Sequence, residues 1–373
     1  MPTRRDLLAG LASAGAVGAA GCVQVGSTDR APAAAGSDAA DTGGTNDASA
    51  EAAQLSGSAT ETEVYRSTIE SVVGVLNYGR NGPQGSGSGF VAGDGYVVTN
   101  QHVVAGATET KLRFQGNVWR DAEVVGTDAY SDLAVLRAEN TPESATPLSW
   151  VDTDPEPPVG TPVMAIGSPY GFSGSASTGI ISGVDRVLSA PNNFTVADSV
   201  QTDAALNPGN SGGPLVTFDG DVAAVAARGG GDNLGFGVSA ALSKRVVPAL
   251  ASDGEYDHSF MGVRLVEVSP AIAEAYDLDD VGGVLIVQVM DGGPADGTLL
   301  GTDGSTTVDG VSVPTGGDIV VGIGGTDVDV QADLSNYLAL ETAPGDAVQF
   351  TMLRDGTETT VEFELGERPD PTR

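Results

Sequence analysis

The stretch Thr202–Leu215 reads TDAALNPGNSGGPL and places Ser211 between glycines on both sides. Glycine permits the left-handed backbone conformations of a tight turn, so the N–H groups of such a turn can converge on one point. A turn of this kind exposes a serine hydroxyl and directs two amides at a developing oxyanion. A Gly-Asn-Ser-Gly-Gly segment by itself is more often an ordinary hairpin. Its chemistry therefore depends on the groups that the rest of the chain supplies.

A serine hydroxyl needs a base before it can act as a nucleophile. The chain has two histidines, His102 and His258, and His102 follows the apolar run Val97–Val98 in VVTNQHVV. Asp132, in YSDLAVL, begins a β-like run and is a candidate to orient the imidazole. Taken singly, such a histidine is usually structural and such an aspartate is usually a turn residue. Asp121 and Asp128 are local competitors for the same role.

Together, the three segments resemble a known family. The order His102, Asp132, Ser211 is that of the chymotrypsin-like serine proteases, and the motifs more closely resemble the HtrA/Deg family, including its haloarchaeal lipoprotein-type members. The matching segments lie between about Val64 and Leu250: GSGSGFV at 85–91, TNQHVV at 99–104, SDLAVL at 131–136, AIGSPYG at 165–171, TGIIS at 178–182 and the Ser211 turn. The resemblance implies a mainly β fold, a chymotrypsin-like double β-barrel with the triad in the cleft between the barrels.

The resemblance also implies the role of each site residue. Ser211 would attack the peptide carbonyl, His102 would take and return the proton, and Asp132 would fix the imidazole tautomer. The N–H groups of Gly209 and Ser211 would form the oxyanion hole, with Asn210 between them. This chemistry requires no metal and no cofactor.

Two positions depart from the trypsin pattern. Ala205 stands six residues before Ser211, where trypsin-like enzymes have a pocket aspartate, so we expect no preference for basic side chains. Asn210 stands where trypsin has the aspartate that pairs with a freed N-terminus, so we do not expect activation by cleavage of a zymogen. The segment NLGFGV at 233–238 is the candidate wall of an apolar specificity pocket, through Leu234, Phe236 and Val238. It is equally typical of an ordinary strand.

The last 115 or so residues resemble a PDZ domain, an α+β fold. Phe260-Met261-Gly262-Val263 resembles the loop that binds a peptide's terminal carboxylate, and the strand after it would pair with that peptide. A helix at 332–341 would form the other wall of the groove. The alternative is a generic small β-rich domain. We expect a loop over 291–314 and expect His258 at the surface of the join between the domains.

The charge composition of the chain excludes one class of function. The 373 residues include 50 acidic and 17 basic ones, for a net charge of −33, which excludes non-specific attraction to nucleic acid as the main activity. Only Lys111 and Lys244 are lysines. Such a chain is typical of proteins adapted to molar salt, where acidic self-repulsion is screened, although ordinary acidic solubility is the alternative. A single cysteine, Cys22, allows no intrachain disulfide.

The N-terminus predicts export. Arg4-Arg5 precedes a short uncharged run, which resembles a twin-arginine signal peptide. AAGC at 19–22 resembles a lipobox, in which Cys22 becomes the lipidated N-terminus; the alternative is a stray cysteine. The predicted organisation is a signal peptide at 1–22, a disordered linker at 23–60, a protease domain at 61–254, a PDZ domain at 255–368 and a tail at 369–373.

These features predict an exported HtrA-like serine endopeptidase, lipid-anchored on the outer face of the cytoplasmic membrane. Its expected partners are unfolded proteins or peptides as substrates and C-terminal peptides at the PDZ domain, and the resemblance implies a homotrimer. The alternative is a peptide-binding chaperone or scaffold with little or no proteolysis. Asn193-Phe194-Thr195 is a pattern for N-glycosylation of Asn193.

Overall fold

The computed structural model describes residues 60–80, 82–93, 95–168, 174–189, 195–231, 233–278 and 281–369. The predicted signal peptide with Arg4, Arg5 and Cys22, most of the predicted linker, and Asn193 lie outside these residues. Within them, no helix is both long enough and apolar enough to cross a membrane.

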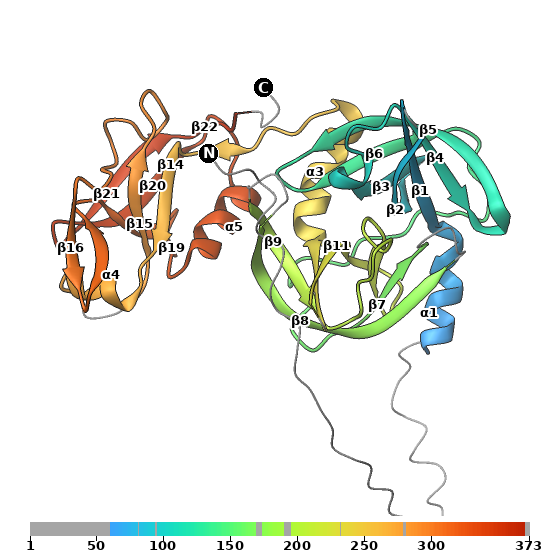
Figure 1. The fold of residues 1–373 in the computed structure, drawn as a ribbon, viewed down its shortest axis with the longest axis horizontal. Helices are drawn as coiled ribbons and strands as arrows, with labels where there is room; N and C mark the ends of the chain where they lie inside the picture. The colour runs from blue at the N-terminus through green and yellow to red at the C-terminus, as the bar shows by residue number, and fades with distance from the viewer. Residues whose placement is uncertain are drawn as a thin grey trace, which may run out of the picture. The chain divides into compact units, whose positions relative to one another are not determined.

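The first part of the fold is a closed six-stranded barrel (Figure 1). It follows a helix whose first turn is held by Thr60 and Glu63, which exchange hydrogen bonds in the capping box that their spacing predicts. The barrel order is β1-β2-β3-β6-β5-β4, and every neighbouring pair is antiparallel. The elements are α1 (Glu61–Thr68), η1 (Ile69–Ser71), β1 (Val72–Gly79), β2 (Gly82–Gly93), β3 (Tyr96–Asn100), α2 (Gln101–Val104), β4 (Glu109–Phe114), η2 (Gln115–Asn117), β5 (Val118–Asp128) and β6 (Leu133–Ala138).

A second closed barrel comes next along the chain, in the order β10-β11-β12-β9-β8-β7. The segment that carries Ser211, the predicted nucleophile, lies between two of its strands, because β9 ends at Thr202 and β10 begins at Pro214. The elements are β7 (Pro162–Gly167), β8 (Ser175–Ser189), β9 (Thr195–Thr202), β10 (Pro214–Thr217), β11 (Val222–Gly231), β12 (Leu234–Ser239) and α3 (Ala240–Ser252).

The two barrels share one core. A single cluster of buried apolar side chains takes Phe90 and Leu133 from the first barrel, Met164 from the second, and Leu242 and Leu250 from α3. Helix α3 approaches the first barrel closely at Gly126, where an added Cβ would lie 2.4 Å from the carbonyl oxygen of Leu250. A residue without a side chain is therefore needed on β5 at this crossing. The shared core fixes how the side chains at the junction of the barrels meet.

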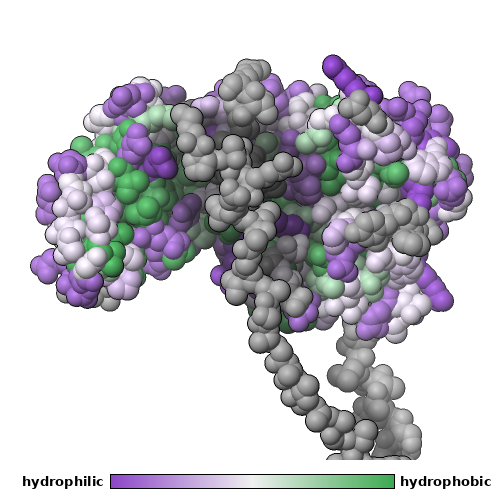
Figure 2. Space-filling view, viewed as in Figure 1, coloured by the Kyte–Doolittle hydropathy of each residue, from purple (hydrophilic) through white to green (hydrophobic). Residues whose placement is uncertain are grey.

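The C-terminal domain is built on a sheet in the order β14-β15-β18-β20-β21, with β19 paired to β18. Its exposed surface is more apolar than that of the barrels: six of the ten large apolar side chains exposed among the described residues lie in it, and Figure 2 shows green patches there, at the left of the view. The elements are β13 (Ser259–Phe260), β14 (Val263–Glu267), α4 (Pro270–Ala275), β15 (Val284–Val289), β16 (Gly304–Val308), β17 (Val311–Thr315), β18 (Ile319–Ile323), β19 (Thr326–Asp327), α5 (Gln331–Glu341), β20 (Ala347–Arg354), β21 (Thr357–Glu364) and β22 (Gly366–Glu367).

One sequence prediction for this domain is wrong. The segment predicted as a loop over 291–314 contains a hairpin, in which β16 pairs with β17. Asp309 and Gly310 make its two-residue turn, and both have positive φ, 48° and 82°. An Asp-Gly dipeptide between two β-like runs is a strong hairpin signal, so the residues themselves carry this information.

His258 is also not the surface residue that the sequence predicts. Its side chain is 9% exposed, and its Nε2 lies 2.7 Å from Oδ2 of Asp128 on β5. The same carboxylate accepts the backbone N–H groups of Tyr130 and Ser131. Burial alone would raise the pKa of the Asp128 carboxyl. Its contacts with His258, Ser131 and the Tyr130 N–H have the larger combined effect, so the pKa is lowered. A buried hydrogen-bonded pair therefore joins the start of the C-terminal domain to the turn that leads to Asp132.

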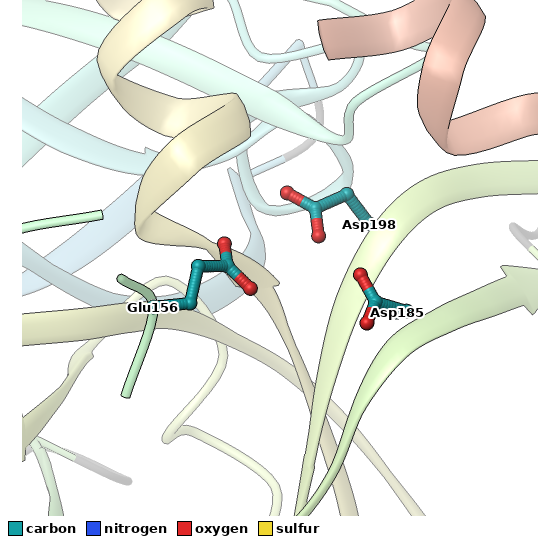
Figure 3. A group of neighbouring side chains, drawn as sticks. All are labelled: Glu156, Asp185 and Asp198. Carbon is teal, nitrogen blue, oxygen red and sulfur yellow. The ribbon is translucent and has the colours of Figure 1, made fainter. Parts of the chain in front are cut away.

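Three carboxylates gather where α3 begins (Figure 3). Glu156 comes from the segment before β7, Asp185 from β8 and Asp198 from β9. Asp198 is 1% exposed and accepts a hydrogen bond from the hydroxyl of Ser239, the N-cap residue of α3. Burial and the two neighbouring aspartates raise the pKa of Glu156 to about 7.

This cluster predicts a pH-dependent loss of stability. The folded chain retains a proton on Glu156 that the unfolded chain, with a pKa near the ordinary value of 4.5, releases. The contribution of Glu156 to the free energy of unfolding is therefore fully present below pH 4.5 and is lost as the pH rises to about 7. We expect Glu156→Gln to match the parent at pH 5 and to exceed it at pH 8 by about 1 kcal/mol, discounted for partial exposure. Urea unfolding at the two pH values measures this difference.

The matched control is Glu143→Gln, which removes an exposed carboxylate elsewhere on the surface. It should behave as the parent does at both pH values. A constant difference between Glu156→Gln and the parent from pH 5 to pH 8 would contradict the prediction.

Candidate active site

His102 and Asp132 form a close pair within the first barrel. His102 lies in the short helix α2, directly after β3, and Asp132 stands one residue before β6, which pairs with β3. Nδ1 of His102 lies 2.7 and 3.0 Å from the two carboxylate oxygens of Asp132, and the backbone N–H of His102 donates to the same carboxylate at 3.0 Å. With Nδ1–H donated to Asp132, Nε2 of the neutral ring is the free acceptor.

Asp132 is itself held on several sides. Its carbonyl oxygen accepts the backbone N–H of Gln101 and the side-chain amide of Asn100, each at 3.0 Å. Its φ is 55°, a left-handed conformation that is uncommon outside glycine. The competitors for the role of orienter are placed elsewhere, because Asp121 pairs with Lys111 and Asp128 with His258.

The Ser211 turn packs directly on the segment that carries His102. An added Cβ at Gly212, whose φ is +84°, would lie 2.2 Å from the hydroxyl oxygen of Thr99 and 3.1 Å from the nitrogen of Asn100. An added Cβ at Gly87 would meet both Val103 and the carbonyl oxygen of Ser211 within 3 Å. Only glycine fits at these positions, which brings the Ser211 turn of the second barrel onto residues 99–103 of the first.

Ser88 on β2 ties the two barrels at this point. Its backbone N–H donates to the carbonyl oxygen of Ser211 at 2.8 Å, and its hydroxyl donates to the carbonyl oxygen of Gly209 at 2.6 Å. The hydroxyl also accepts the N–H of Ser168 at 2.8 Å. Ser88 is fully buried. It belongs to the sequence motif at 85–91, but the sequence pattern alone gives it no role.

Of the backbone N–H groups of residues 209–211, one is hydrogen-bonded within the turn and two have no acceptor among the described residues. That of Asn210 donates to the carbonyl oxygen of Asn207 at 2.9 Å, and the Asn210 side chain is buried. Those of Gly209 and Ser211 have no acceptor among the described residues. Of the three residues named for the oxyanion hole, Asn210 therefore has its amide already occupied. The other two amides are available to a ligand.

The Ser211 hydroxyl donates to the carbonyl oxygen of Ala227 on β11 at 2.7 Å. It therefore does not point its proton at His102. Catalytic hydrogen bonds are often incomplete until substrate binds, and rotation about one side-chain bond redirects the hydroxyl.

A pocket of about 270 Å³ lies beside Ser211. Its lining differs from the predicted one, since Ala205, Leu234, Phe236 and Val238 do not belong to it. Val238 is fully buried in the shared core, and the Leu206 side chain lies over Gly235, so the segment before Ser211 covers this strand. The wall is made by Leu206, Asn207, Pro208, Ala226, Ala227, Arg228 and Gly229.

A second groove, of about 440 Å³, lies between β14 and α5 of the C-terminal domain and is also lined by Tyr130, Thr195, Ala197 and Leu242 of the preceding barrels and α3. Phe260, Met261, Gly262 and Val263 line it, as do Leu334 and Leu338 of the opposite helix. Gly262 has a φ of +75°, which favours glycine in this loop. The N–H groups of Met261 and Gly262 donate to no acceptor within the described residues. The residues named as a carboxylate loop thus lie at a groove with free backbone donors.

Comparison with known proteins agrees with this geometry. Residues 87–225 match the model of the trypsin-like peptidase domain, and residues 259–365 match that of the PDZ domain. A probable periplasmic serine endoprotease DegP-like from Hahella chejuensis is 35% identical over 301 residues, covering 78% of this chain and 60% of the relative. One from Ectopseudomonas mendocina is 34% identical over 293 residues, covering 77% and 57%. The chain thus spans less than two thirds of the length of these relatives.

Solved structures give the same result. The HtrA-type protease AlgW with a tripeptide matches with a TM-score of 0.68 and 27% identity, over 84% of this chain and 99% of that one. The serine endoprotease from Yersinia pestis matches with a TM-score of 0.59 and 25% identity, over 83% and 98%. The mainly β fold is confirmed as chymotrypsin-like, followed by a PDZ domain. This chain is homologous to the DegP/HtrA serine proteases and combines a trypsin-like peptidase domain with one PDZ domain.

Proposed function

We propose that this chain is a serine endopeptidase that hydrolyses peptide bonds in unfolded or misfolded exported proteins. The observation that carries the proposal is the His102–Asp132 pair, held in one tautomer by contacts of 2.7 and 3.0 Å, on the segment against which the Ser211 turn packs. An oriented imidazole beside a serine in a glycine turn is suited to acyl transfer.

In the proposed mechanism, Ser211, His102 and Asp132 act in successive steps. The Ser211 hydroxyl leaves the Ala227 carbonyl and gives its proton to Nε2 of His102 as the oxygen attacks the substrate carbonyl. Asp132 stabilises the imidazolium that forms. The N–H groups of Gly209 and Ser211 receive the oxyanion. His102 then protonates the leaving amine, and water, activated by the same imidazole, hydrolyses the acyl-enzyme.

Ser88 has the role of a positioning residue in this scheme. It holds the carbonyl groups of Gly209 and Ser211, and each of these residues also provides one of the two free N–H groups. These carbonyls belong to the peptide planes 209–210 and 211–212, each of which directly follows a plane that carries one of the two free N–H groups. Anchoring them holds the turn on one side of each donor and so restricts the direction of both amides. The donors are then in place before the charge develops, which is the condition for efficient oxyanion stabilisation.

The alternative is a peptide-binding chaperone or scaffold with little proteolysis. The observation that favours it is the Ser211 hydroxyl, which donates to Ala227 rather than to His102. The same arrangement suits a resting protease, so activity measurements separate the two functions.

We further propose export with lipid attachment at Cys22, a tether at 23–60 and assembly as a homotrimer. The support for export and lipid attachment is the twin-arginine and lipobox patterns, together with relatives described as periplasmic. The trimer rests on the family resemblance. Adaptation to molar salt is proposed on the net charge of −33.

The first prediction tests the triad. Ser211→Ala and His102→Ala should each lower kcat on an unfolded protein such as casein by about 10³-fold or more, with folding retained. Labelling by an organophosphonate probe should be lost in Ser211→Ala and should occur at Ser211 in the parent. Near-parental hydrolysis by purified Ser211→Ala protein would contradict the assignment. A parent that binds unfolded protein but neither cleaves it nor reacts with the probe would support the alternative.

The second prediction concerns Ser88. Ser88→Ala should lower kcat about tenfold with KM nearly unchanged, because it loosens a donor turn that acts in the transition state. Affinity for a peptidyl boronate should fall with kcat, whereas affinity for an uncleaved peptide should not. Ser86→Ala, on the exposed part of the same strand, is the matched control. A lower folding stability with an unchanged kcat would limit Ser88 to a structural role.

The third prediction concerns the groove between β14 and α5. A peptide with an apolar C-terminal residue should bind there with a Kd on the order of micromolar, because the N–H groups of Met261 and Gly262 are free. The amidated peptide should bind at least tenfold more weakly. Titration of the full chain with both forms, monitored by fluorescence anisotropy, measures this. Equal affinity for the two forms would argue against recognition of the carboxylate.

A further inference from the structure

The pocket beside Ser211 has one charged residue in its lining, Arg228. The other lining residues are apolar, glycine or uncharged polar, and Leu206 and Pro208 provide apolar surface. The sequence predicts a purely apolar pocket. The pocket in the structure instead combines apolar walls with a single cation.

The position of Arg228 is set by β11. The N–H and carbonyl of Ala226 bond to Gly213 and Gly212, and the carbonyl of Ala227 accepts the Ser211 hydroxyl. Arg228 is the next residue and pairs on its other side with Phe236 of β12. Ala227 is 2% exposed, whereas Arg228 is exposed. The backbone of Arg228 is therefore fixed close to the nucleophile, and its side chain is open to solvent at the pocket.

No carboxylate of the described residues lies within ion-pair distance of Arg228. Acidic residues outnumber basic ones 50 to 17 in this chain, so partners for a cation are abundant. Among the residues that the structure describes, none therefore competes with a ligand carboxylate for the guanidinium. Arginine binds carboxylates through two parallel hydrogen bonds, which is a directional contact as well as a charge contact.

We propose that Arg228 is a specificity-determining residue that binds an acidic side chain of the substrate, on the N-terminal side of the scissile bond. The inference rests on the proposed peptidase function and names its substrate class: unfolded segments in which an acidic residue accompanies an aliphatic one. A net charge of −33 repels acidic peptides at low salt. A cation at the pocket offsets that repulsion locally. Because a contact ion pair is partly hydrogen-bonded, it persists in part when salt screens the long-range field.

The test compares three fluorogenic peptides with one aliphatic cleavage residue and either Asp, Asn or Lys as its N-terminal neighbour. The enzymes are the parent, Arg228→Gln and Arg228→Glu, each with its active sites counted by an organophosphonate. The parent should show a kcat/KM about three- to tenfold higher for the Asp peptide than for the Asn peptide, at the lowest salt at which it remains folded. Arg228→Gln should abolish this preference, and Arg228→Glu should favour the Lys peptide.

The matched control is Arg66→Gln, which removes an exposed arginine on α1 and should keep the parental preference. If the parent cleaves the Asp and Asn peptides equally, or if Arg228→Gln keeps the preference, the role of Arg228 is overturned while the peptidase function stands. If the parent cleaves none of the peptides and does not react with the organophosphonate, the proposed function itself fails, and this inference fails with it.

Discussion

The hydrogen bonds of Ser88 are the contact on which the catalytic arrangement depends. His102 and Asp132 belong to one barrel and Ser211 to the other, so no local segment of chain can bring the three together. Ser88 joins the barrels at the Ser211 turn, through bonds of 2.8 and 2.6 Å to the carbonyl groups of Ser211 and Gly209. The buried cluster shared by both barrels and α3 provides the rigidity behind this contact. Glycines at 87 and 212 make the approach sterically feasible.

A second constraint is electrostatic and concerns the turn 128–132. Both histidines of the chain pair with aspartates at the two ends of this turn, His258 with Asp128 and His102 with Asp132. Both carboxylates are nearly buried, and a buried charge without a partner costs several kcal/mol. The first pair fixes the turn in place, and the second uses the turn to orient the imidazole. One short segment thus has a structural and a chemical function that depend on different histidines.

Much of this arrangement could be predicted from the sequence, and the remainder could not for identifiable reasons. Local signals are reliable here: the spacing of Thr60 and Glu63 predicts the capping box that they form, and Ser239, a residue type that favours the N-cap position, caps α3. The predicted loop at 291–314 is wrong because it gives no weight to the Asp309–Gly310 turn signal. The burial of His258 depends on a contact with Asp128, 130 residues away, that no local pattern encodes. The lining of the pocket likewise depends on Leu206 covering Gly235, which is a tertiary contact.

The buried pair of Asp128 and His258 makes the peptidase domain thermodynamically incomplete without the C-terminal part of the chain. Arg368 adds to this connection, since its guanidinium lies 3.8 Å from the centre of the Tyr130 ring, two residues before Asp132. A chain shortened to the two barrels would leave the Asp128 carboxylate without its His258 contact and the Tyr130 ring without the Arg368 guanidinium. Loss of activity in such a fragment would report a disturbed catalytic turn as readily as a lost peptide-binding module. The contacts of His258 and Arg368 therefore tie the stability of the turn that carries Asp132 to the C-terminal part of the chain.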